Sequence, residues 1–362
     1  MSDATHMHHA LRLAARGLGR VAPNPAVGCV IVSPRGQIVG RGWTQPGGRP
    51  HAETEALKQA GDAARGATAY VTLEPCAHEG QTPPCASALI EAGVARVVIA
   101  IEDPDPRVSG KGIEMLRAAG IEVTNNVLRE EAEKLNEGFF LRVTQNRPLV
   151  TLKIAQSLDG CTATASGDSR WITGEEARGF AHLMRARHDA ILIGVETALS
   201  DDPELTCRLP GLEDRSPIRV VLDTRLRLNE YSKLAQTARD VPLWVFTTAN
   251  GGGGLEAAGA EIIRVARDVR GRPDISACLN VLAARGVTRL LVEGGATVHA
   301  AFLDRGLGDR LEIFTAPVVL GAAGHGAIDA LAAITLEEAP RFERLTRRKL
   351  GRDLLESFAA KA

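Results

Sequence analysis

The chain alternates short apolar runs with helix-like segments along almost its whole length, and it does so in two series. The first series closes with a helical segment at 129–143, and the second begins at 149, directly after the polar stretch TQNRP at 144–148. Continuous apolar strands that alternate with helices are typical of a largely parallel sheet that is covered on its faces. Because 362 residues exceed the size at which one core stops growing, we predict two α/β domains, 1–146 and 147–362.

Apolar periodicity and turn residues predict the individual elements. In the first domain we expect helices at 8–18, 52–60, 84–92, 110–119 and 129–143, and strands at 27–32, 37–42, 68–73, 96–101 and 121–127. The first two strands are expected to form a hairpin around 34–36. In the second domain we expect strands at 149–155, 189–194, 218–223, 242–248, 261–265, 288–293 and 309–317, and helices at 174–187, 274–285 and 296–305. The glycine run at 251–254 is interpreted as a flexible loop.

Charge and composition exclude some classes of function. The formal net charge is −1, so no overall field gathers polyanions, which argues against a general nucleic-acid or membrane-surface binder. No stretch of 18 apolar residues is present, and the N-terminus has no apolar run typical of a signal peptide. We therefore expect a cytoplasmic protein without a membrane partner. In that compartment the six cysteines are better interpreted as thiols or metal ligands than as disulfides.

One group of residues has the composition of a metal site. His51 lies in GRPHAETEAL, at the start of a predicted helix, while Cys76 and Cys85 lie in TLEPCAHEGQTPPC. All three are at strand-to-helix junctions. One imidazole and two thiolates form a three-ligand set for Zn²⁺, which leaves the fourth tetrahedral position for water. Thiols at helix N-termini ionise readily because of the helix dipole.

A carboxylate close to the ligands is needed to move protons between water and a leaving amine. Glu53 and Glu55 are the two candidates. On a regular helix Glu55 would share the face of His51, because it lies four residues further on. We prefer Glu53, since Pro50 favours a helix boundary at His51, and residues before the regular helix do not follow its periodicity.

The pattern H-x-E…P-C-x-x-C is typical of zinc-dependent nucleobase deaminases. This chain keeps HAE and EPC, but eight residues separate its two cysteines instead of two. The inserted residues include His78. If His78 were a fourth ligand, the site would be closed and structural, although a structural site has no need of a neighbouring carboxylate.

In the second domain, polar and glycine residues follow several predicted strands. Gly194, Asp223–Thr224 and Glu293–Gly295 each stand where a strand ends, although the chain has no G-x-G-x-x-G motif. Ligands of open α/β sheets bind at this edge, and glycines before the helix at 296–305 would admit a phosphate to its N-terminus. Tight strand-to-helix turns would explain the same residues equally well.

Several longer stretches resemble one family closely. In the first domain they are PNPAVGCVIV, PHAE, TLEPCAHEGQTPPC and EDPDPRVSGKG, and in the second KIAQSLDG, ASGDSRWIT, LMRARHDAILIGVETALSDDPELTCR, VLDTRLR and VEGGATVHAAFL. Together they are similar to the bifunctional riboflavin-biosynthesis enzymes. These join a diaminohydroxyphosphoribosylaminopyrimidine deaminase to a 5-amino-6-(5-phosphoribosylamino)uracil reductase. The long loop that ends in TPPC is typical of that family.

The resemblance implies a cytidine-deaminase-like α/β/α domain followed by a dihydrofolate-reductase-like α/β domain, with Zn²⁺ and NADPH as cofactors. It implies that His51, Cys76 and Cys85 bind zinc and that Glu53 is catalytic. The residues that would contact NADPH are Ala155, Trp171, Thr197, Asp201, Thr224, Gly295, Ala296, Thr297, Val298, His299, Ala300 and Ala301. Those that would contact substrate are Asn24, Ser169, Arg185, Leu205, Arg208 and Glu293. It also implies a small phosphorylated pyrimidine as substrate and a homo-oligomer formed through the reductase domain.

An alternative belongs to another class: a nucleic-acid deaminase, such as one acting on tRNA, with an appended binding module. An RNA substrate requires a basic stripe and stacking aromatic side chains. Aromatic residues make up 4% of this chain and its charge is balanced, so we expect no nucleic-acid partner.

Overall fold

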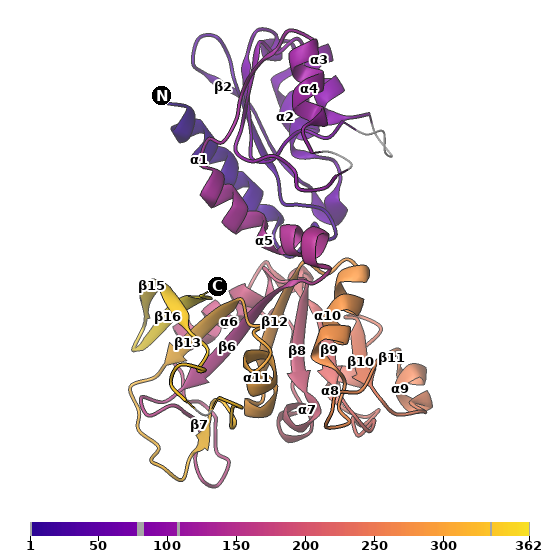
Figure 1. Cartoon of the computed structure of the whole chain (residues 1–362), viewed down its shortest axis with the longest axis vertical. Coiled ribbons are helices and arrows are strands. Elements are labelled where there is room, and N and C mark those ends of the chain that lie inside the picture. The colour runs from indigo at the N-terminus through magenta and orange to yellow at the C-terminus, as the bar shows by residue number, and fades with distance from the viewer. Residues whose placement is uncertain (1, 78–82, 107–108, 334, 362) are drawn as a thin grey trace. The chain divides into compact units, whose positions relative to one another are not determined.

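The structure is a computed structural model that describes residues 2–77, 83–106, 109–333 and 335–361. The chain forms two compact units, Met1–Arg147 and Pro148–Ala362. His78, the alternative fourth ligand, lies outside the described residues. Each unit has its own sheet and its own core (Figure 1).

Unit 1 is built on a five-stranded sheet in the order β2-β1-β3-β4-β5. Its strands are β1 Gly28–Val32, β2 Ile38–Trp43, β3 Thr68–Val71, β4 Arg96–Ile99 and β5 Glu122–Thr124. Its α-helices are α1 Asp3–Ala14, α2 Ala52–Ala60, α3 Cys85–Glu91, α4 Lys111–Ala118 and α5 Arg129–Gln145. Strand β1 runs antiparallel to β2, which confirms the expected hairpin, but it also runs antiparallel to β3, so the sheet is less parallel than expected. The short β1–β2 connection allows only an antiparallel hairpin.

Glycines let two helices approach this sheet closely from opposite faces. A Cβ atom on Gly28 would lie 2.0 Å from the carbonyl oxygen of Ala10 in α1. Cys29, the next residue of β1, points to the other face of the sheet and pairs with Gly42 of β2. A Cβ atom on Gly42 would lie 2.0 Å from the carbonyl oxygen of Ala52 in α2. Neighbouring residues of a strand point to opposite faces, so α1 and α2 sandwich the sheet. The contact at Gly42 fixes the first turn of α2, where the expected metal site begins.

The first helix differs from the prediction of 8–18. It starts at Asp3, because the Ser2 side chain caps it by accepting a hydrogen bond from the Thr5 N–H. His6 therefore lies in a regular helical turn and is buried against Tyr70, with 4.9 Å between the ring centroids.

Unit 2 contains a nine-stranded sheet in the order β11-β10-β9-β8-β12-β6-β13-β16-β15. Its strands are β6 Leu149–Gln156, β8 Ala190–Gly194, β9 Ile218–Leu222, β10 Leu243–Thr247, β11 Glu261–Arg264, β12 Arg289–Gly294, β13 Arg310–Thr315, β15 Phe342–Leu350 and β16 Asp353–Ala360. A separate pair joins β7 Cys161–Ala163 to β14 His325–Gly326. The helices are α6 Glu175–Arg185, α7 Val195–Asp201, α8 Lys233–Gln236, α9 Gly253–Ala258, α10 Ile275–Ala284 and α11 Ala296–Leu303.

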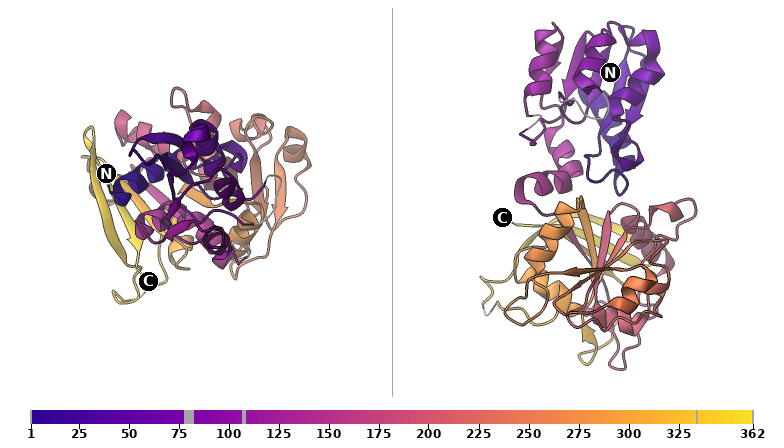
Figure 2. Two further views of the ribbon diagram at one scale, coloured as in Figure 1. Left: turned by 90° about the horizontal axis from the view of Figure 1, so that it is seen from above. Right: turned by 90° about the vertical axis from the view of Figure 1, so that its right-hand side faces the viewer.

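Side-chain alternation along the central strands divides the core of unit 2 into two layers. In β8, Ala190 and Leu192 face the cluster that contains α10 and α11, whereas Ile191 and Ile193 face the cluster that contains α6, α7 and α8. Figure 2 shows helices against both faces of this sheet. A strand covered on both sides reads as a continuous apolar run, which is why the sequence pattern predicted it.

Several elements of unit 2 were not predicted, namely helices α7, α8 and α9, the β7–β14 pair and the β15–β16 hairpin. Strand β15 lies at the sheet edge and its residues from Glu343 to Lys349 are all exposed, so it has no apolar face that could indicate a strand. The glycine run is not wholly a loop, because α9 begins at Gly253. A Cβ atom on Gly254 would lie 1.7 Å from a carboxylate oxygen of Glu230, so a larger residue there would displace that side chain.

Among the described residues, no helix has both the length and the apolar character needed to cross a membrane.

Candidate active sites

The expected zinc ligands converge in unit 1. Helix α2 begins at Ala52, and His51 precedes it with extended backbone angles (φ −72°, ψ 161°). The Nδ1 atom of His51 lies 3.2 Å from Cys85 Sγ and 3.7 Å from Cys76 Sγ, and the three ligand atoms all lie within 4.8 Å of one another. Tetrahedral zinc with ordinary bond lengths places nitrogen and sulfur ligands about 3.6 Å apart and two sulfurs about 3.8 Å apart. The donor set and its spacing therefore fit Zn²⁺.

Backbone geometry supports this arrangement. Cys85 is the first residue of α3, and its N–H donates a hydrogen bond to the Cys76 sulfur at 3.3 Å. Hydrogen bonds from Cys85 and His51 lower the pKa of Cys76 to about 4. The pKa of Cys85 is raised, because its thiol shares a proton with Cys76 and is buried. The two sulfurs therefore compete for one proton, an arrangement that a divalent cation relieves by binding both as thiolates.

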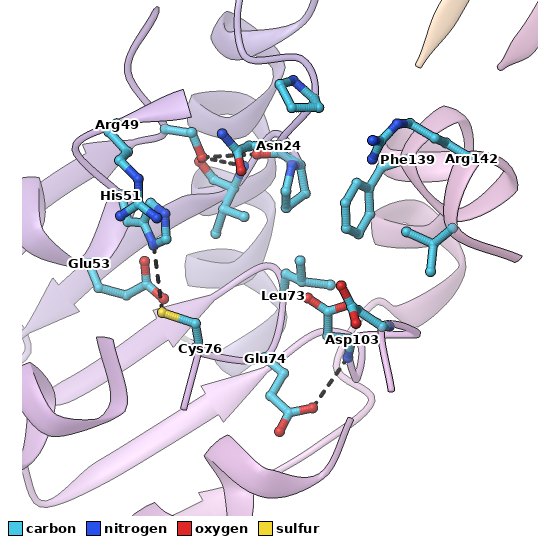
Figure 3. Close-up of a pocket in the computed structure, with 16 residues that line it drawn as sticks. Asn24, Arg49, His51, Glu53, Leu73, Glu74, Cys76, Asp103, Phe139 and Arg142 are labelled. Atoms are coloured by element: carbon cyan, nitrogen blue, oxygen red, sulfur yellow. Dashed lines mark hydrogen bonds between the residues drawn. The ribbon is translucent and has the colours of Figure 1, made fainter. Parts of the chain in front are cut away.

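Glu53 lies beside the ligands in a buried position. Its side chain is 3% exposed, and it lines a cavity of about 230 Å³ together with His51, Cys76 and Asn24 (Figure 3). Burial, together with the charge of Cys76, raises the pKa of Glu53 to about 7. Glu55 is not among the residues that line this cavity. Because His51 precedes the regular helix, the i,i+4 argument for Glu55 does not apply.

The cavity also involves residues to which the sequence analysis assigned no role. They are Pro23, Pro25, Val27, Thr44, Arg49, Leu73, Glu74, Asp103, Asp105, Phe139, Arg142 and Val143. Asp103 and Asp105 belong to EDPDPRVSGKG, so the family motif pointed to their segment without indicating their function. Arg49 and Arg142 place positive charge in the cavity, and Figure 3 shows Arg142 beside Phe139, away from the zinc ligands.

In unit 2 the residues expected to contact NADPH gather at one edge of the sheet. Strands β6, β8, β9 and β12 are neighbours and run parallel, so their C-terminal ends lie together. Ala155 lies near the end of β6, Thr197 and Asp201 are in α7 after β8, and Thr224 follows β9. The stretch 295–301 follows β12.

The turn from β12 into α11 has the form required to accept a phosphate. Gly295 has φ of 81°, a conformation that favours glycine, and a Cβ there would lie 3.3 Å from Thr197 Oγ1. Backbone without a side chain at a helix N-terminus can approach a pyrophosphate closely, so this cradle fits NADPH. Within the same stretch His299 is buried, with Nδ1 3.2 Å from the Ala327 carbonyl oxygen, and its side chain packs in the interior. Trp171 is 65% exposed and stacks with Arg178, whose guanidinium carbon lies 4.7 Å from the ring centroid.

Two of the residues expected to contact substrate are paired with each other. The Arg185 guanidinium donates to both carboxylate oxygens of Glu293, at 2.7 Å and 2.9 Å. Lys153 Nζ lies 3.8 Å from the same carboxylate. Burial opposes the ionisation of Glu293, but the charges of Arg185 and Lys153 lower its pKa to about 2. Lys153, to which the sequence analysis assigned no role, thus belongs to a buried charge cluster.

The remaining expected substrate residues differ in exposure. Arg208 is about half exposed and pairs with Glu204 at 3.2 Å, while its backbone N–H donates to His182 Nδ1 in α6. Arg185 also donates to the carbonyl oxygen of Thr206 at 3.0 Å, so the segment 205–208 lies against the charge cluster. Leu205 is 4% exposed and belongs to the core, whereas Ser169 is half-buried.

Comparison with known proteins identifies a family model for each unit. The family model described as "RibD C-terminal domain" matches residues 148–355, and that described as "Cytidine and deoxycytidylate deaminase zinc-binding region" matches residues 1–101. The riboflavin biosynthesis protein RibD of Haemophilus influenzae is 41% identical over 99% of this chain and 98% of its own, and that of Bacillus amyloliquefaciens is 46% identical over 87% and 85%.

Solved structures confirm the expected two-domain α/β fold. A structure of Acinetobacter baumannii RibD superposes with a TM-score of 0.90 at 39% identity, covering 99% of both chains. The Thermotoga maritima diaminohydroxyphosphoribosylaminopyrimidine deaminase/5-amino-6-(5-phosphoribosylamino)uracil reductase gives 0.88 at 36% identity, again over 99% of both chains. The chain therefore belongs to the RibD family of riboflavin-biosynthesis enzymes, in which a zinc-dependent deaminase and an NADPH-dependent reductase are joined in one polypeptide.

Proposed function

We propose that residues 1–146 carry the deaminase and residues 147–362 the reductase, with the individual residue roles set out below. The first reaction hydrolyses 2,5-diamino-6-(5-phosphoribosylamino)pyrimidin-4-one: water adds to the ring carbon, and the exocyclic amine leaves as ammonia. The second transfers hydride from NADPH to the anomeric carbon of 5-amino-6-(5-phosphoribosylamino)uracil and opens the ribosyl ring to a ribityl chain.

In the deaminase, His51, Cys76 and Cys85 hold the metal, which when bound supplies a Lewis acid that makes water nucleophilic near neutral pH. Glu53 accepts the proton from water and returns it to the leaving amine. Asn24 holds the pyrimidine on the opposite side of the cavity. Arg49 and Arg142 are the charges we assign to the substrate's phosphate-bearing end. The observation that carries this assignment is the convergence of the three ligand atoms within 4.8 Å of one another, next to a cavity that Glu53 lines together with His51 and Cys76.

The direct test of the two activities uses one purified protein. Ammonia release from the diaminopyrimidine and NADPH oxidation with the deaminated intermediate are measured separately. Both should occur, and ammonia release should not require NADPH. A protein that oxidised NADPH without releasing ammonia would refute the deaminase assignment. A protein that deaminated a tRNA in preference to the nucleotide would support the alternative, a nucleic-acid deaminase. The match of the second unit to the RibD C-terminal domain argues against that alternative.

In the reductase we assign NADPH to the edge formed by Ala155, Trp171, Thr197, Asp201, Thr224 and the stretch 295–301. Substrate would meet Ser169, Arg185, Arg208 and Glu293, and Leu205 through its backbone. The bound nicotinamide supplies hydride. The protein's own contribution is to orient the ribosyl group through the Arg185–Glu293 pair and to bind the phosphate with arginine and serine side chains.

Substitution of the two arginines should separate phosphate binding from folding. We expect Arg208→Ala to raise the KM for the phosphorylated substrate about tenfold, because one charge-assisted contact is lost at a half-exposed position. The KM for NADPH should stay near its wild-type value, as steady-state kinetics with each substrate varied in turn will show. If the KM for NADPH rises instead, Arg208 serves the cofactor.

Arg185→Ala should behave differently, since it leaves the buried Glu293 carboxylate without its bidentate partner. Loss of one member of a buried ion pair costs about 3–5 kcal/mol. Urea unfolding of unit 2 should therefore detect a lower free energy of unfolding for Arg185→Ala and almost no change for Arg208→Ala. Equal stability of the two variants would contradict a structural role for the Arg185–Glu293 pair.

The domain assignment predicts that the halves work independently. A fragment of residues 1–146 should bind zinc and deaminate alone, and a fragment of residues 147–362 should reduce alone, because each unit has its own sheet and core. Circular dichroism and the two separate assays will check this. Insoluble fragments would mean that the two units share a core. Fragments that fold but have exchanged or lost activities would refute the assignment itself.

A homo-oligomer formed through the reductase domain, the absence of a nucleic-acid partner and a cytoplasmic location complete the proposal.

A further inference from the structure

Glu74 lies between the end of β3 and the ligand Cys76, and its carboxylate is buried at 3% exposure. One oxygen accepts hydrogen bonds from the backbone N–H groups of Gly112 at 2.9 Å and Ile113 at 3.2 Å. The other accepts from Gly110 at 3.0 Å and Asp103 at 3.3 Å. A carboxylate buried this completely and surrounded by four donors holds those four backbone positions in fixed geometry.

The backbone positions that Glu74 holds belong to two parts of one segment. Gly110, Gly112 and Ile113 form the start of α4, while Asp103 stands near the other end of the segment 102–110. The start of α4 also packs tightly on the segment that carries the ligand Cys76, because a Cβ atom on Gly112 would lie 2.0 Å from the Pro75 carbonyl oxygen. Glu74 thus connects the backbone next to Cys76 with a segment that is distant in sequence.

Described residues near the start of that segment lie in the wall of the deaminase cavity. Asp103 and Asp105 both line it, and each is 7% exposed. The Asp105 N–H donates to Asp103 Oδ1 at 2.8 Å, so the placement of Asp105 depends on that of Asp103. Figure 3 shows the Asp103 side chain at the cavity wall and its backbone linked to Glu74.

We propose that Glu74 is a positioning residue for deamination, which holds Asp103 where its carboxylate accepts hydrogen bonds from the ring N–H and amino groups of the aminopyrimidine. The inference rests on the proposed function of this cavity. An ionised carboxylate only accepts hydrogen bonds, and an aminopyrimidine presents several donors along its edges. Glu74 also lines the cavity, but its carboxylate accepts its four hydrogen bonds from backbone N–H groups, so we assign the substrate contact to Asp103 and the positioning role to Glu74.

Glu74→Gln tests the hydrogen bonds of Glu74 specifically, because the glutamine side chain has nearly the same shape as the glutamate side chain. Each carboxylate oxygen accepts from two N–H groups. An amide replaces one oxygen with an NH₂ group, which would face two donors and accept from neither. Glu102→Gln is the matched control, because Glu102 is an exposed residue of the same segment. Within the described part of the chain, its carboxylate accepts a solvent-exposed hydrogen bond from Ser109 Oγ at 3.0 Å.

The experiment compares Glu74→Gln, Asp103→Asn, the double variant and Glu102→Gln, all in the full-length zinc-loaded protein. We expect Glu74→Gln and Asp103→Asn each to raise the KM for deamination about ten- to a hundredfold, with a smaller effect on kcat. The double variant should be no worse than the more damaged single variant, because Glu74 acts through Asp103. Zinc content, the reductase constants and the Glu102→Gln kinetics should match those of wild type.

Several outcomes would overturn the inference. Multiplication of the two KM effects in the double variant would show that Glu74 does not act through Asp103. Loss of zinc or of folded unit 1 in Glu74→Gln would make it a structural residue of the metal site. An unchanged KM in Asp103→Asn would show that Asp103 does not contact the substrate, whatever the result for Glu74→Gln. A wild-type protein that released no ammonia would refute the proposed function and the inference with it, whereas the other outcomes refute the inference alone.

Discussion

Glu53→Gln should lower the rate of deamination about 10²- to 10⁴-fold, the range expected when a general acid–base group is lost. The glutamine side chain fills the same volume, but it can neither accept the proton from water nor return it to the amine. Glu53 is buried in the cavity and is not a member of the ligand set, so zinc content should remain at about one per chain. Ammonia release and metal analysis on the same sample provide the measurement.

Glu55→Gln is the matched control, because Glu55 is two residues further along the same helix and outside the cavity. Its deaminase activity should stay within a few-fold of wild type. If Glu55→Gln is the inactive variant and Glu53→Gln the active one, the proton-transfer role belongs to Glu55.

Cys76→Ser should abolish both zinc binding and ammonia release while NADPH oxidation on the deaminated intermediate continues. Serine lacks the thiolate that zinc prefers, and the loss leaves one imidazole and one thiol as ligands. The reductase should be unaffected because its proposed residues all lie in the other unit. Metal analysis and the two assays, run on one preparation, check all three expectations.

Removal of the metal from the wild-type protein supplies the control for Cys76→Ser. A strong chelator should abolish ammonia release, and added Zn²⁺ should restore it in the wild type but not in the variant. A Cys76→Ser protein with full deaminase activity would show that the ligand assignment is wrong.

Local sequence signals were sufficient for much of the fold and of the zinc site. Helix α2 follows Pro50 and His51, and α3 opens at Cys85 after two prolines, because proline restricts the backbone on both sides of a boundary. The central strands of unit 2 are buried on both faces, so their continuous apolar runs identify them. Where a residue type and a boundary together define a function, as for the ligand set, sequence alone was enough to form the hypothesis.

Tertiary structure decided the features that depend on contacts between distant segments. The four backbone donors around Glu74 come from residues 29 to 39 positions further on. Arg185 meets Glu293 across 108 positions. Neither contact can be recognised from the periodicity of the sequence, because the sequence around a single charged residue does not indicate whether that residue is solvated or buried against a partner.

The same limit explains the elements that differed from prediction. The exposed edge strand β15 lacks an apolar face, and α9 begins within a glycine run, a composition that favours a loop. By itself the sequence determined where strands and helices alternate and which residue types could bind zinc, because backbone boundaries and apolar periodicity are local. Only the tertiary structure decided which charges are buried together and which walls complete the cavity, because burial is set by packing between segments far apart in the chain.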